Sequence, residues 1–193
     1  MTNPEDSKPQ NIVPSGSKYT VGDVGAGAQV AQGEHIYMGA AQNPEVAKQE
    51  GRDCLKRGQA ALVRDDYASA KQELEKAIGI LHEDELPKEV AKVRYLLALI
   101  QLDRQRPFLQ TLPTMRSVES LLKSAIALHH SASYILTLAF FKLDFARNGL
   151  PQLVSEAYKL VDQANQMAWQ SEDDENFEVL KQCQPDLFED YLE

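Results

Sequence analysis

The sequence has few of the features that define the common functional classes. It holds two cysteines, Cys54 and Cys183, one tryptophan, and no run of eighteen apolar residues. The lack of such a run excludes a membrane-spanning helix. The N-terminus has neither the basic cluster nor the apolar stretch of a secretory signal, so we expect a cytoplasmic protein. In that compartment two cysteines so far apart are expected to be free thiols.

A surplus of basic residues is also absent, because the net charge is −9. Residues 171–193 account for most of it, with one lysine against nine acidic residues, whereas residues 41–170 are close to neutral. Nucleic-acid binding requires lysine and arginine gathered on one surface, so this distribution argues against it. The acidic end is expected to be a solubilising terminus, or to meet a basic patch on a partner or on a second copy.

The stretch from Gly51 to Leu81 predicts a specific pair of helices. Small and apolar residues recur there every three or four positions in two runs, which the polar Arg64-Asp65-Asp66 separates. This spacing is typical of amphipathic helices, and two such helices joined by a short turn pack antiparallel. The positions expected to face inward are Gly51, Cys54, Leu55, Gly58, Ala61 and Leu62 in the first run and Tyr67, Ala70, Leu74, Ala77, Ile78 and Leu81 in the second.

Part of this pattern resembles the tetratricopeptide repeat (TPR), which places small residues where its two helices touch. The matching residues are Gly58, Tyr67, Ala70, Leu74 and Ala77. The chain departs from the motif at Cys54, Arg57 and His82, where tryptophan, leucine and proline are usual. The resemblance implies stacked helix pairs whose concave surface holds a peptide or a partner domain without chemical change.

The remainder of the chain after residue 43 also predicts helices. Asn43-Pro44-Glu45 is a helix start signal, and Leu86-Pro87 begins a third helix. Residues 114–129 and 131–147 predict the fourth and fifth, and the fifth is apolar nearly all round, which is typical of the most buried element. A sixth follows Asn148-Gly149. The prediction is an all-α, TPR-like array of about six helices over residues 43–170, followed by an acidic capping helix or tail over residues 171–193.

The leader before this array has a different pattern. Residues 1–18 are polar and proline-containing, which predicts disorder. Residues 19–42 contain four glycines and alternate apolar with polar residues, which predicts a β-forming segment. Gly25 and Gly27 supply only the first half of a GxGxxG motif and no lysine follows, so a phosphate-binding loop is not expected.

An alternative function rests on this glycine-rich segment. Residues 28–33 resemble the cores of amyloid-type signalling motifs of bacterial and fungal immune receptors, although Ala31 stands where such cores favour glycine. The resemblance implies pairing with a partner's strand, or self-association. The residues expected to pair are Val24, Ala28, Gln29, Val30, Gln32 and Gly33.

Candidate sites for chemistry are weak. His82 precedes three acidic residues, and His129-His130 end the fourth predicted helix, but neighbouring side chains at a helix end point in different directions. A solvated turn and favourable helix-dipole contacts explain both better than a metal does. The pKa of Cys54 could be lowered by the nearby Arg52, Lys56 and Arg57. However, Cys54 falls on the inward face of the predicted helix, which indicates a role in packing. We therefore predict no catalytic residue, no metal and no cofactor.

Recognition of a protein or peptide is the function that the sequence favours. In the TPR-like arrangement the exposed residues of the first helix in each pair would face the ligand, and their charge favours an acidic peptide or a C-terminal carboxylate. The protein's own acidic tail is a second candidate occupant. The predicted partner-binding residues are Arg52, Lys56, Gln59, Lys92, Arg94, Gln101 and Arg104.

Overall fold

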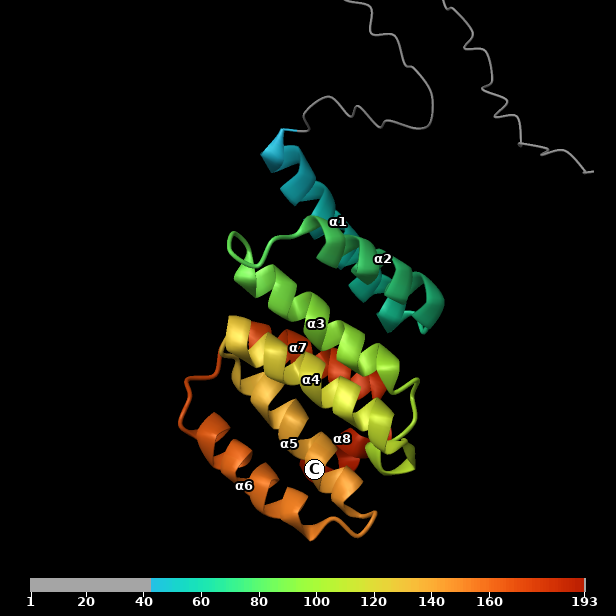
Figure 1. Ribbon diagram of the computed structural model, residues 1–193, viewed down its shortest axis with the longest axis vertical. Coiled ribbons are helices and arrows are strands. Elements are labelled where there is room, and N and C mark those ends of the chain that lie inside the picture. Colours follow the sequence, from blue (N-terminus) through green and yellow to red (C-terminus); the bar gives the residue numbers. More distant parts are fainter. Residues whose placement is uncertain (1–42, 193) are drawn as a thin grey trace, which may run out of the picture. The chain divides into compact units, whose positions relative to one another are not determined.

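The computed structural model describes residues 43–192, and this part of the chain is all-α (Figure 1). Three helix pairs follow one another: α1 (Pro44–Val63) with α2 (Tyr67–Ile80), α3 (Pro87–Gln101) with α4 (Leu112–Leu128), and α5 (Ala132–Ala146) with α6 (Pro151–Asn165). A 3₁₀ turn, η1 (Pro107–Leu109), lies before α4, and two further helices, α7 (Ser171–Cys183) and α8 (Pro185–Leu192), follow α6. The prediction of an all-α domain is confirmed for these residues. The residues predicted to pair as strands lie outside residues 43–192. They are Val24, Ala28, Gln29, Val30, Gln32 and Gly33.

Local sequence signals set the helix ends. The side chain of Asn43 accepts a hydrogen bond from the Glu45 amide at 3.2 Å, and Pro44 occupies the first turn of α1. Asp66 caps α2 by accepting from the Ser69 amide at 3.0 Å. Gly149 has a positive φ of 83° between α5 and α6, a conformation that glycine adopts without steric cost.

The helices within each pair pack most extensively on each other, and successive pairs then stack. In the first pair, the Cα of Gly58 lies so close to α2 that a Cβ built there would be 2.7 Å from Cγ of Leu74. Leu74 and Ala70 are fully buried at this crossing. The small residue allows the two helices to approach closely, as the sequence pattern predicted.

The longest connection in the domain, between α3 and α4, is held by charge. The guanidinium of Arg106 pairs with Asp144 of α5 and, at 2.6 Å, with Asp190 of α8. The second oxygen of Asp144 accepts from the Phe108 amide at 3.0 Å. The insertion between α3 and α4 is therefore fixed to α5 by the fully buried carboxylate of Asp144 and to α8 by the more exposed carboxylate of Asp190.

Helix α5 is the most buried helix, as its sequence predicted, because elements pack on several of its sides. Besides α6 it contacts α4, α7, α8 and η1. The ring of Tyr134 stacks on Tyr95 of α3 with centroids 4.7 Å apart, and Phe140 stacks on Tyr191 of α8 at 5.8 Å. No helix within residues 43–192 is long and apolar enough to cross a membrane.

Candidate partner-binding surfaces

The predicted partner-binding residues fall into two groups. Lys56, Gln101 and Arg104 are exposed, and Arg52 and Gln59 are half-buried. Lys92 and Arg94 differ from the expectation, because their side chains are only 14% and 18% exposed. Their charged ends meet acidic groups of the same chain, which the residue pattern of α3 alone does not reveal.

Most of these cations have intramolecular partners. Arg52 pairs with Glu89 at 3.1 Å, and Arg94 pairs with Glu83 and donates to the Ser124 hydroxyl. Arg104 pairs with Asp65 and lies over the ring of Tyr67, with 5.4 Å between its guanidinium carbon and the ring centroid. Arg104 also follows the end of α3 rather than lying on it. The structure therefore does not gather the seven residues into one open basic groove.

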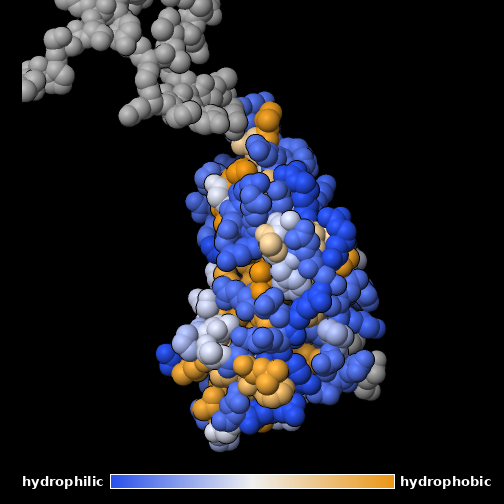
Figure 2. Space-filling model, turned by 90° about the vertical axis from the view of Figure 1, so that its right-hand side faces the viewer, coloured by the Kyte–Doolittle hydropathy of each residue, from blue (hydrophilic) through white to orange (hydrophobic). Residues whose placement is uncertain are grey.

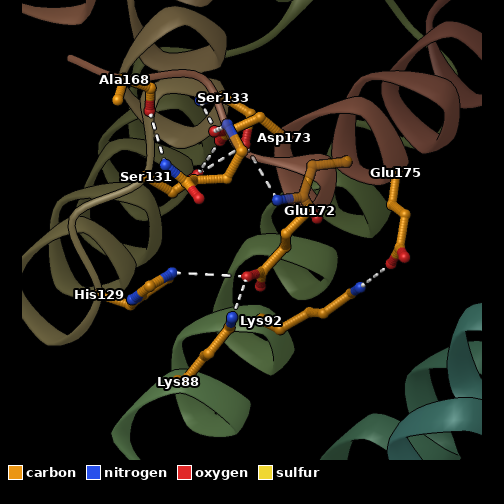
Figure 3. Close-up of polar contacts among 11 residues, drawn as sticks. Lys88, Lys92, His129, Ser131, Ser133, Ala168, Glu172, Asp173 and Glu175 are labelled. Carbon is orange, nitrogen blue, oxygen red and sulfur yellow. Dashed lines mark hydrogen bonds and ion pairs between the residues drawn. The ribbon is translucent and has the colours of Figure 1, made fainter.

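The acidic helix α7 lies against the first helices of the three pairs. It contacts α1 and α5, and its carboxylates reach the lysines of α3 (Figures 1 and 3). Glu172 pairs with Lys88 and lies 3.6 Å from His129 Nε2, and Glu175 pairs with Lys92 at 3.2 Å. The sequence suggested the acidic tail as an occupant of the predicted partner-binding face, and α7 pairs there with Lys92, one of the seven predicted residues.

A buried carboxylate fixes the start of α7. Asp173 accepts from the Ser131 hydroxyl at 2.5 Å, from the Ser133 amide at 2.9 Å and from the Gln170 amide at 2.9 Å. Burial alone would raise its pKa, but these hydrogen bonds hold the pKa below its usual value. The same carboxylate thus completes the N-terminus of α7 and binds the N-terminus of α5, where the helix dipoles favour negative charge.

An apolar groove opens on a different surface, between α4 and α6, with α5 as its floor. Its volume is about 340 Å³. On the side of the domain seen in Figure 2, hydrophobic side chains gather mainly in the part away from the start of α1. Arg116, Glu119, Lys142 and Gln152 add polar groups to the groove. Its apolar lining is Leu112, Met115 and Val118 of α4, Leu138, Phe141 and Phe145 of α5, and Leu150 and Leu153 beside or on α6.

Lys142 carries a buried charge beside this groove. Its amino group lies 2.7 Å from Glu119 of α4 and 2.8 Å from Glu156 of α6. Burial by itself lowers the pKa of Lys142, but the two glutamates more than offset this and the pKa is raised. The charged lysine therefore links three helices. The sequence analysis did not predict this pairing, although a lysine inside the apolar run of residues 134–145 is a signal that could have revealed it.

The cysteines and histidines considered for chemistry lie in different surroundings. Both thiols are free and buried, and burial raises the pKa of Cys54 and raises that of Cys183 to about 11. His82 is exposed, and His130 contacts the side chain of Gln163 at 3.1 Å. Among the residues that the structure describes, no three His, Cys, Asp or Glu side chains are placed to hold a metal.

No protein-family model, no curated protein and no solved structure matches the chain. The fold and the surfaces described above are therefore the basis for assigning a function.

Proposed function

We propose that this protein is a non-enzymatic, TPR-like adaptor that binds a protein or peptide partner in the groove between α4 and α6. The observation that carries the proposal is the apolar groove itself, about 340 Å³ and lined by leucine, methionine, valine and phenylalanine. Apolar grooves between helices bind apolar side chains of a peptide or a partner helix, and nearby polar groups set the orientation.

The charges around the groove suggest the chemistry of the partner. Glu119 and Lys142 neutralise each other, whereas Arg116 is exposed at the groove. A suitable partner would have a large apolar side chain next to a carboxylate. The apolar side chain would be buried against Phe141 and Phe145, and the carboxylate would lie near Arg116. The partner is still expected to be acidic, but its proposed binding site is this groove and not the face that α7 covers.

A peptide-display selection against the immobilised full-length protein tests the proposal. The test variant is Gln152→Trp, which places an indole at the groove from an exposed position. The matched control is Ser155→Trp, which adds the same side chain to an exposed position of the same helix.

We expect enriched peptides that bind the wild type and Ser155→Trp alike and lose about tenfold or more in affinity on Gln152→Trp. Failure to enrich any peptide, or equal binding to both variants, would refute the groove as the partner site.

A further inference from the structure

The three pairs differ in how their second helices are covered. Helix α2 packs on α1 and α3, and α4 packs on α3 and α5. Within residues 43–192, α6 packs extensively on α5 alone, and it is the last helix of the stack of pairs (Figure 1). An amphipathic helix with only one packing partner leaves part of its apolar surface uncovered.

A repeated triplet shows which part of α6 is uncovered. All three second helices carry apolar residues at positions i, i+4 and i+7. The middle residue is fully buried in the first two, at Leu74 and Leu122, but its counterpart Val161 is only half-buried. The triplets are Ala70, Leu74 and Ala77 in α2, Val118, Leu122 and Ala125 in α4, and Ala157, Val161 and Ala164 in α6.

In the second pair, the flank of α4 that contains Leu122 faces the next helix of the stack. Glu119 on this flank pairs with Lys142 of α5 at 2.7 Å, and Met115 lines the groove together with Phe141 of α5. Helix α5 is thus the element that covers this flank of α4.

Counting from the triplet, the residues of α6 that correspond to Met115, Glu119 and Leu122 are Val154, Tyr158 and Val161, here called the α6 stripe. The opposite flank of α6 faces α4, because Glu156 and Glu119 of α4 pair with the same amino group, that of Lys142, at 2.8 and 2.7 Å. The α6 stripe therefore points away from α4, toward the position of a next helix. Val154 and Val161 of this stripe are half-buried and Tyr158 is 61% exposed.

We propose that the α6 stripe is the docking surface for an α-helix of a partner protein, which takes on α6 the position that α5 takes on α4. The packing of α5 on α4 specifies the occupant, a helix with large apolar residues spaced as Leu138, Phe141 and Phe145 are. Tyr158 replaces the carboxylate of Glu119, so the docked helix needs no cation at the position of Lys142.

A second copy of this chain fits the α6 stripe less well than a partner helix does. Two copies of net charge −9 repel each other. Head-to-tail stacking would place α1 on the stripe, but the outer face of α1 presents Glu50, Asp53 and Arg57 around a shallow hollow. Burying these charges against valine and tyrosine is unfavourable.

The test is a displayed library of amphipathic helices whose apolar residues are varied at i, i+3 and i+7, selected against the full-length protein. Two variants disrupt the α6 stripe, Val161→Lys and the more exposed Tyr158→Lys. Ser155→Lys is the control, since it adds the same charge at an exposed position of α6. Far-UV circular dichroism and the urea midpoint identify any variant that fails to fold.

We expect enriched helices to bind the wild type and Ser155→Lys alike, and to lose about tenfold or more on both stripe variants. Their binding to Gln152→Trp should be unchanged, which separates this docking surface from the groove. Failure to enrich any helix, or equal binding to Tyr158→Lys, would overturn the inference. So would sedimentation showing a wild-type dimer that Tyr158→Lys abolishes, since a second copy would then be the occupant.

Discussion

Asp173 at the start of α7 accepts a hydrogen bond from the backbone amide of Ser133 at the start of α5, 2.9 Å away and 40 positions earlier in the chain. The carboxylate is buried and also accepts from the Ser131 hydroxyl and the Gln170 amide. One side chain thus satisfies donors from two helix starts, which fixes α7 against the helix pairs.

Replacing Asp173 by alanine should therefore destabilise the whole domain. The buried donors of Ser131 and Ser133 would lose their acceptor, and we expect the free energy of unfolding to fall by about 2–4 kcal/mol in urea titrations. Glu175→Ala on the same helix removes an exposed carboxylate and should cost less than about 1 kcal/mol. Equal losses in the two variants would contradict the structural role of Asp173.

The same carboxylate should make stability depend on pH. Its pKa is depressed in the folded protein, so its contribution is complete above about pH 4, the ordinary value for aspartate, and is lost as the pH falls through the lower folded-state pKa. We expect the difference in unfolding free energy between the wild type and Asp173→Asn to shrink as the pH is lowered from 6 toward 2. A difference that stays constant over that range would show that the charge of Asp173 contributes nothing.

Substitution by alanine should change the stability of the domain in opposite directions at two glycines. At Gly58 a Cβ would lie 2.7 Å from Cγ of the fully buried Leu74 and 3.4 Å from the carbonyl oxygen of Ala70, so Gly58→Ala should destabilise by about 1–3 kcal/mol despite the better helix propensity. At Gly79 a Cβ meets no atom within 4 Å, and Gly79→Ala should stabilise by about 0.5–1 kcal/mol. Thermal or urea unfolding of both variants measures the contrast, and a stabilised Gly58→Ala would disprove the close crossing of α1 and α2.

Lys142 should be more sensitive to the loss of its stem than to the loss of its charge. Lys142→Met keeps the volume between α4, α5 and α6, whereas Lys142→Ala removes the charge and opens a cavity. We expect alanine to cost about 2–4 kcal/mol and methionine less than about half of that, measured by urea titration. If methionine is the worse of the two, the paired charge rather than the packing holds these helices together.

Local patterns in the sequence predicted much of the fold. The spacing of Gly58, Tyr67, Ala70 and Leu74 indicated the first helix pair, and the structure has a close crossing there with Leu74 fully buried. The apolar run around Phe141 correctly indicated the most buried helix. Such features depend on residues close together in the sequence, so periodicity and capping signals are sufficient to predict them.

The surfaces were harder to predict because they depend on pairs far apart in the chain. The sequence placed Lys92 and Arg94 on an exposed face, but Glu175 and Glu83 pair with them. Nothing in the pattern of residues 171–193 shows that Glu175 would lie beside α3. The groove was missed for the same reason, since its walls come from three helices; the position of Lys142 within an apolar run was a signal that the sequence analysis did not use.

The position of α7 has a consequence for how the chain acquires its fold. Stacked helix pairs ordinarily gain stability from their immediate neighbours, so the first pairs can form while the rest is still being made. Here, Lys88 and Lys92 find Glu172 and Glu175 only after some eighty more residues have been synthesised. The contacts between α3 and α7 therefore form only after residues 171–183 have been made, and the finished domain should unfold as one cooperative unit rather than pair by pair.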